Sequence, residues 1–235
     1  ASLLFIPPTI FATENDNLPF DDVSDSDPNA QYIYDLYQKG IVQGMTQSTF
    51  EPGTPLTREQ FAKLVVEAFE IERTNQDTPF QDLKSEWSKP YIAAAYHAQI
   101  IKGVSETSFN PEGQLRRQEA ASIVWRLLFN NGVPPTEDND IDVSDADIWA
   151  SESVKNIIKL GLRTERFEST PYRSKEIMSR GDAAALISLA IREKSYGWKK
   201  AIQDEIVYQP SVIVLEGLSD VSRVEENTFQ IPKEQ

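Results

Sequence analysis

Cysteine is absent from the 235-residue sequence, and histidine occurs only once, as His97. A chain without thiols has no disulfides and no thiolate metal ligands. One imidazole leaves no plausible histidine zinc site or histidine-centred catalytic triad, and His97 is interpreted as a partly exposed side chain in a helix. We therefore predict no metal, no cofactor and no cysteine- or histidine-based catalysis.

Basic residues are also scarce, because 23 Lys and Arg stand against 37 Asp and Glu, a formal net charge of −14. This balance argues against a general nucleic-acid binder, which needs basic surfaces for phosphate contacts. It does not exclude an anionic ligand, because a local basic site can exist on an acidic surface.

Long hydrophobic runs are missing as well. The uncharged, apolar segment 1–12 is too short to span a bilayer, and an acidic, Asn-containing stretch follows Ala12. We interpret 1–12 as the remnant of a secretory signal peptide and 13–19 as a linker; the alternatives are a first strand or an unstructured tail. The prediction is a secreted chain with no membrane association after signal cleavage.

What the sequence does contain is a degenerate repeat. The string Leu56-Thr57-Arg58-Glu59-Gln60-Phe61-Ala62 returns at 115–121 and 178–184, and its arginines, Arg58, Arg117 and Arg180, lie 59 and 63 residues apart. Such a period indicates one supersecondary unit used three times. Each arginine is predicted to open a helix, with Thr57 and Gln60 forming a capping box and Ser179 and Asp182 repeating that logic.

Other signals precede each arginine in a fixed order. Asp22, Asp82 and Asp142 each stand before an aliphatic residue, and a segment with helical apolar spacing follows. Glycines are predicted to end this first helix, namely Gly40 with Gly44, Gly103, and Gly161. An aromatic residue lies eight positions before each arginine: Phe50, Phe109 and Tyr172.

These signals predict an all-α fold of three helix-loop-helix repeats. We place the repeats at 20–73, 74–135 and 136–194, followed by a C-terminal extension over 195–235 that forms a short hairpin or a tail. The broad apolar stripes of the second helices indicate that these helices share one core.

The repeats resemble three tandem S-layer homology motifs over residues 20–192. Repeat one supplies Gly40-Ile41-Val42-Gln43-Gly44, Phe50-Glu51-Pro52 and Thr57-Arg58-Glu59-Gln60; repeat two supplies Trp87-Ser88 and Phe109-Asn110-Pro111; repeat three supplies Asp142-Val143 and Trp149-Ala150. The chain departs from the family pattern with Pro28 near a tryptophan position, Arg116 in place of threonine, and no second glycine in repeat three.

The resemblance implies a pseudo-threefold helical domain around a central bundle, with grooves between repeats. It also implies non-covalent anchoring to a bacterial secondary cell-wall polysaccharide that carries pyruvylated N-acetylmannosamine, at the cell wall or S-layer, beside S-layer or other cell-surface proteins. The rival hypotheses are a surface protein that self-assembles without binding glycan, and a wall-associated enzyme using paired carboxylates.

Ten residues are candidates for ligand binding. The guanidinium of arginine can donate two parallel hydrogen bonds to a planar carboxylate. At the first turn of a helix, free backbone amides and the helix dipole also favour an anion. Aspartates accept bonds from sugar hydroxyls, tryptophans offer flat faces, and glycines let the backbone approach a ligand. The candidates are Arg58, Arg117, Arg180, Asp22, Asp82, Asp142, Trp87, Trp149, Gly44 and Gly103.

Each candidate also has a structural interpretation. The arginines can pair with acids of a neighbouring repeat, the aspartates can brace loops, the tryptophans can be core, and the glycines can be helix stops. We expect the loss of Arg58 or Arg117 to lower affinity while changing stability much less, because both arginines are taken to be surface residues. Repeat three, with its longer loop and Gly181, is expected to bind most weakly.

Overall fold

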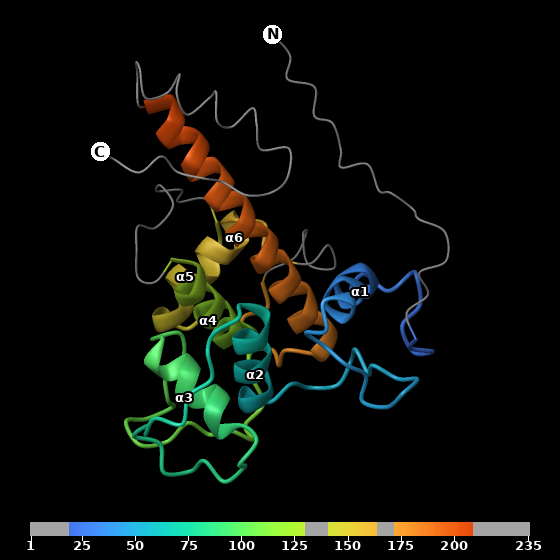
Figure 1. Ribbon diagram of the computed structural model, residues 1–235, viewed down its shortest axis with the longest axis vertical. Helices are drawn as coiled ribbons and strands as arrows, with labels where there is room; N and C mark the ends of the chain where they lie inside the picture. The colour runs from blue at the N-terminus through green and yellow to red at the C-terminus, as the bar shows by residue number, and fades with distance from the viewer. Residues whose placement is uncertain (1–18, 130–140, 164–171, 209–235) are drawn as a thin grey trace, which may run out of the picture.

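The computed structural model describes residues 19–129, 141–163 and 172–208 (Figure 1). Helices joined by turns and loops, with isolated bridges and no strands, make up the described residues, which confirms the predicted all-α class. The helices are α1 (Ala30–Gln38), α2 (Arg58–Ala68), α3 (Lys89–His97), α4 (Arg117–Phe129), α5 (Ile148–Lys159) and α6 (Arg180–Tyr208). The predictions for the signal remnant and for most of the linker lie outside the described residues.

Helices α2, α4 and α6 begin at the three predicted arginines. The capping box of α2 is confirmed: Gln60 N donates to Thr57 Oγ1 and Thr57 N donates to Gln60 Oε1, at 3.3 and 3.0 Å. In α6, Asp182 N donates to Ser179 Oγ at 3.1 Å. Arg116 offers no side-chain acceptor at the start of α4, but its backbone N–H still donates to Glu119 Oε2.

A closed ring of three backbone hydrogen bonds joins the repeats just before these helices. Leu56 N donates to Met178 O, Met178 N to Leu115 O, and Leu115 N to Leu56 O, at 3.0, 2.8 and 2.9 Å. All three side chains are buried in the core. Because each repeat gives and receives one bond, the ring defines the pseudo-threefold axis.

The helices pair between repeats rather than within them. Helix α3 packs on α2, α5 on α4, and α1 on α6, so the first helix of each repeat covers the second helix of the preceding one (Figure 1). Helix α6 also contacts α2 and α4. The buried side chains form one continuous cluster, which confirms a core shared by the three repeats.

Two helix ends differ from the predictions. Gly40 and Gly161 have left-handed backbones, with φ of +69° and +66°, as predicted for glycines that end helices. In repeat two, however, Gln99 takes this conformation at φ +61°, and Gly103 does not end the helix. Helix α6 continues to Tyr208, so the first part of the predicted extension is helical; the hairpin proposed beyond it lies outside the described residues.

Within the described ranges, no helix combines the length and apolar character needed to cross a bilayer.

Candidate functional site

Each of the three arginines reaches into the aromatic loop of another repeat. Its guanidinium lies over an aromatic ring, and its Nε donates to the backbone carbonyl of the same aromatic residue. The pairs are Arg58 with Phe109, Arg117 with Tyr172 and Arg180 with Phe50, at Nε–O distances of 2.8, 2.9 and 3.0 Å and ring distances of 4.8, 4.7 and 4.6 Å. The sequence singled out both members of each pair but not their pairing across repeats.

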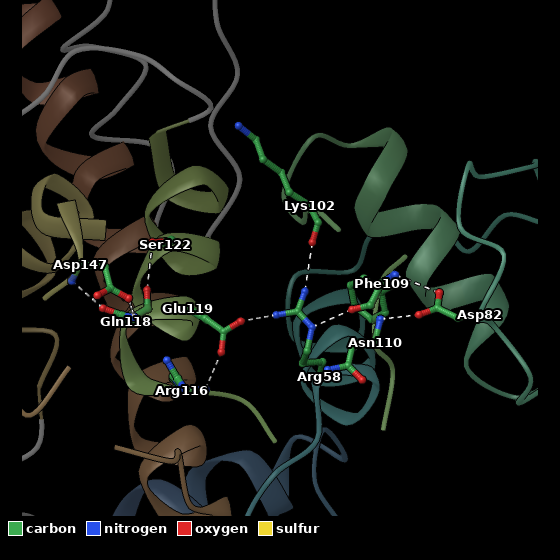
Figure 2. Close-up of polar contacts among 10 residues, drawn as sticks. All are labelled: Arg58, Asp82, Lys102, Phe109, Asn110, Arg116, Gln118, Glu119, Ser122 and Asp147. Carbon is green, nitrogen blue, oxygen red and sulfur yellow. Dashed lines mark hydrogen bonds and ion pairs between the residues drawn. The ribbon is translucent and has the colours of Figure 1, made fainter. Parts of the chain in front are cut away.

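The carboxylate partners distinguish these junctions. Arg58 Nη1 lies 2.5 Å from Glu119 Oε1, and Arg117 Nη1 lies 3.3 Å from Asp182 Oδ2 (Figure 2 shows the first pair). Both acids occupy the third position of the next repeat's second helix. The same position in repeat one holds Gln60, and no described residue forms an ion pair with Arg180.

Arg58 and Arg117 are buried, so each contributes to the packing of the fold as well as to the charge of its junction. They retain only 7% and 4% of their exposure, whereas Arg180 is half-buried. Burial lowers the pKa of Arg58, although Glu119 partly offsets this effect. Because neither Arg58 nor Arg117 is a surface residue, the premise that their loss would change stability little is wrong.

The amides at the helix N-termini are already occupied. The first two N–H groups of α2 donate to Gly113 O and Pro111 O at 2.9 and 3.0 Å. Those of α4 and α6 donate in the same way to carbonyls of the neighbouring repeat: Glu176, Ser174, Thr54 and Pro52. An anion at a junction would therefore meet the guanidinium rather than these amides.

Two of the candidate aspartates brace the aromatic loops. Asp22 accepts from Phe50 N and Glu51 N at 2.8 and 2.6 Å. Asp82 makes the equivalent bonds to Phe109 N and Asn110 N (Figure 2). Partial burial opposes the charge of Asp82, but bonds from Ser108 and these amides lower its pKa overall.

The third candidate aspartate is displaced from this role. Asp142 is exposed and accepts from the nearby Ser144 N at 2.9 Å. Asp145 instead holds the loop of repeat three, accepting from Ser174 N and Ser174 Oγ at 2.6 and 3.0 Å. The Asp-aliphatic pattern did not identify Asp145, because the bracing residue lies three positions later.

The candidate tryptophans and glycines have opposite surroundings. Trp87 and Trp149 are 47% and 59% exposed, which fits flat surface faces rather than core residues. Gly44 and Gly103 pack internally: a Cβ on Gly103 would lie 2.4 Å from Ser105 O and 2.6 Å from Phe80. The small size of these glycines is thus already required by the loop itself.

Sequence inspection missed Arg126, which lies on the last turn of α4 near Arg58 and has no carboxylate partner among the described residues. No local signal marked this residue, because its neighbours Ile100 and Arg58 come from other segments of the chain.

These features define an all-helical module whose repeats interlock through arginine–aromatic junctions. The family model for the S-layer homology domain matches residues 19–62 and 79–121. The chain belongs to the S-layer homology domain proteins, and the structure shows the same arginine–aromatic geometry in its third repeat.

Several curated proteins are similar to this chain. The "Endoglucanase" of Bacillus sp. (strain KSM-635) is 28% identical over 219 residues, covering 89% of this chain and 22% of that protein. The "S-layer protein sap" of Bacillus anthracis is 29% identical over 171 residues, covering 71% and 20%. The "Cellulosome-anchoring protein" of Acetivibrio thermocellus is 28% identical over 122 residues, covering 50% and 27%. The chain thus spans about a fifth to a quarter of the length of these relatives.

Proposed function

We propose that this chain is a cell-wall anchoring module that acts at a bacterial surface and binds an anionic secondary cell-wall polysaccharide at the junctions between its repeats. The observation that carries this proposal is the guanidinium at each junction, held in place by a carbonyl and a ring of another repeat. Family membership, and relatives named as S-layer and cellulosome-anchoring proteins, support the surface role.

The proposed ligand is a polysaccharide of the pyruvylated N-acetylmannosamine type. A pyruvate ketal carries a planar carboxylate, which a guanidinium binds through parallel N–H donors. Arg180 donates hydrogen bonds to Phe50 O and Gln43 O and forms no ion pair with a described residue. Burial lowers its pKa, and the nearby carboxylates of Glu51 and Asp22 partly offset this effect. Its remaining N–H groups are suited to a carboxylate from outside the protein.

The junctions are proposed to differ, but not in the order expected from the sequence. That order assumed that Gly181 makes the first turn of the second helix in repeat three flexible. In the structure Gly181 N donates to Pro52 O at 2.9 Å, and a Cβ on Gly181 would lie 2.9 Å from Asn29 Nδ2. We propose instead that Arg117, which is 4% exposed beside a cavity of about 10 Å³, is mainly structural, because that volume holds about one water.

The exposed tryptophans are proposed to contribute stacking surfaces for pyranose rings. Trp87 and Trp149 lie at or just before the first turns of α3 and α5. Asp22 and Asp82, by contrast, are proposed to act indirectly, by fixing the loops whose carbonyls hold the arginines.

Catalysis and self-assembly remain the competing hypotheses. One relative is named as an endoglucanase, but the match spans 22% of that protein, and we propose that the repeat unit itself is not catalytic. A turnover assay on purified wall tests the enzyme hypothesis. Light scattering with and without wall polysaccharide tests assembly in the absence of glycan.

The decisive experiment compares retention of the full chain on native and de-pyruvylated cell wall. We expect retention on native wall only, and an affinity about tenfold lower for Arg180→Gln, since one charge-assisted bond contributes roughly 1.5 kcal/mol. Arg192→Gln is the control, because Arg192 pairs with Asp35 of α1 and lies twelve residues further along α6 than Arg180. Equal retention on both walls would reject the pyruvylated ligand.

A further inference from the structure

The segment that follows α2 and the first turn of α3 form an open cavity, beside two helices that lie against each other (Figure 1). Its volume is about 400 Å³, and the described residues that line it are Glu72, Arg73, Thr74, Asn75 and Pro90. Cavities that bind small molecules have volumes of about 300–1,000 Å³. None of the five lining residues belongs to the arginine–aromatic junctions.

Backbone hydrogen bonds hold the segment that forms most of this wall. Ile71 N donates to Val66 O at 3.0 Å, which ties the start of the segment to the last turn of α2. Thr74 N then donates to Pro90 O at 3.5 Å, which ties the segment to the start of α3. The cavity is therefore formed by the fold itself, as most ligand sites are.

The guanidinium of Arg73 is positioned by a buried aromatic ring. Arg73 Nη1 donates to Tyr91 Oη at 3.4 Å, and the guanidinium lies over the same ring at 5.5 Å. Tyr91 is buried and donates in turn to Glu67 Oε1 at 3.0 Å. Since arginine has five N–H donors, a single bond to Tyr91 leaves donors for a ligand.

Glu72 places the opposite charge on the same cavity. Neither Glu72 nor Arg73 forms an ion pair with a described residue, whereas Lys63 and Glu67, which also contact Tyr91, lie 3.9 Å from each other. Single surface charges are solvated by water and need no partner. Two opposite, unpaired charges that line one cavity are different, because a ligand with both an ammonium and a carboxylate meets a counter-charge for each group.

The other lining residues suit the remainder of such a ligand. The side-chain amide of Asn75 offers both donors and an acceptor, as a peptide group does. Pro90 contributes an apolar ring and has no N–H of its own. Thr74 Oγ1 accepts from Gln76 N at 3.2 Å, so its hydroxyl hydrogen is still available to a ligand.

We propose that this cavity binds a free amino acid or a short peptide with both ends uncapped. Arg73 binds the carboxylate, Glu72 binds the ammonium, and Asn75 hydrogen-bonds to the groups between them. The site is separate from the proposed polysaccharide site, because the two share no residue.

Amide NMR titration of the full chain with trialanine tests the site. We expect saturable shifts at Asn75 and its neighbours. N-acetyl trialanine lacks the ammonium and trialanine amide lacks the carboxylate, so each should bind about tenfold more weakly. Alanine that binds as well as trialanine assigns a free amino acid, and binding of trialanine alone assigns a peptide. No saturable shift at these residues with any probe, or equal affinity for the capped and uncapped peptides, overturns the proposal.

Two substitutions assign the two ends of the ligand. Glu72→Gln should weaken trialanine binding about tenfold and leave the affinity for N-acetyl trialanine unchanged, because that probe has no ammonium. Arg73→Gln should weaken trialanine binding and leave the affinity for trialanine amide unchanged. Glu70→Gln is the matched control, because Glu70 is exposed two residues earlier and is not among the lining residues.

The pattern across the probes separates binding from folding. Arg73→Gln also removes the contact with Tyr91, whereas the Glu72 side chain has no hydrogen bond or ion pair with another described residue. Glu72→Gln therefore tests the site in an undisturbed fold. If Glu72→Gln weakens all the probes equally, or weakens none, the assignment of the ammonium to Glu72 is refuted and the proposal fails.

Discussion

Replacing Arg58 with alanine should destabilise the fold, although Arg58 was selected as a ligand residue. The substitution removes bonds to Phe109 O and Lys102 O and leaves Glu119 without its counter-charge. Removing one member of a fully buried pair costs about 3–5 kcal/mol. The Glu119 side chain retains 21% exposure, so water can solvate part of it, and we expect a loss of about 2–4 kcal/mol.

Urea unfolding followed by circular dichroism measures this loss, and an unchanged m-value shows that the unfolded state is comparable. Arg192→Ala is a matched control, because Arg192 also pairs with a carboxylate but its side chain is 53% exposed. Exposed pairs contribute about 0–1 kcal/mol.

A double-mutant cycle with Glu119→Gln isolates the pair itself. Glutamine keeps an acceptor for Arg116 N while removing the charge left by Arg58→Ala, so the two losses should fall short of additivity by about 1–2 kcal/mol. If Arg58→Ala costs no more than Arg192→Ala, the interpretation of Arg58 as a buried inter-repeat brace is wrong.

Three further predictions concern the other junctions and loops. Gln60→Glu places an acid at the position that Glu119 and Asp182 occupy in the other repeats. This acid should pair with Arg180, raise the free energy of unfolding by about 0.5–1 kcal/mol and weaken wall binding. Higher wall affinity would contradict this prediction. Gly103→Ala should cost about 1–3 kcal/mol in chemical unfolding, because its Cβ would meet Ser105 O at 2.4 Å, whereas Gly53→Ala, with nothing within 4 Å, should be close to neutral. The pKa of Asp82 is lower in the folded state than in the unfolded state, where it is about 4. The Asp82 carboxylate therefore stabilises the fold above about pH 4, and this stabilisation is lost as the pH falls through the folded-state pKa. The stability of Asp82→Asn should depend less on pH in the acid range than that of wild type.

Much of the fold could be predicted from local patterns in the sequence. The starts of α2, α4 and α6 were predictable because the capping groups lie within four residues of each other. The apolar spacing also identified core residues, including Ile33, Ile92 and Ile157, all fully buried. These features depend on contacts that are close in the chain.

Long-range pairing was not predictable in the same way. The repeat predicted two helices per unit but not which helices pack together, and α1 packs on α6, which is the last helix in the chain order. Likewise, nothing in the residue type marks Glu51 and Arg173 as left-handed, yet their φ values are +59° and +58°; Asn110, at +57°, is of a type that tolerates this conformation. The backbone N–H of Glu51 donates to the bracing Asp22, so a tertiary contact accompanies a conformation that is uncommon for glutamate.

One side chain per repeat decides what each junction arginine is able to do. The backbone geometry is nearly constant, since the Nε–O distances differ by only 0.2 Å, from 2.8 to 3.0 Å. The third residue of the next second helix varies from Glu119 to Asp182 to Gln60. A carboxylate at this position pairs with the guanidinium and ties two repeats together. Beside the neutral Gln60, we propose that Arg180 keeps N–H donors for an anion from outside the protein.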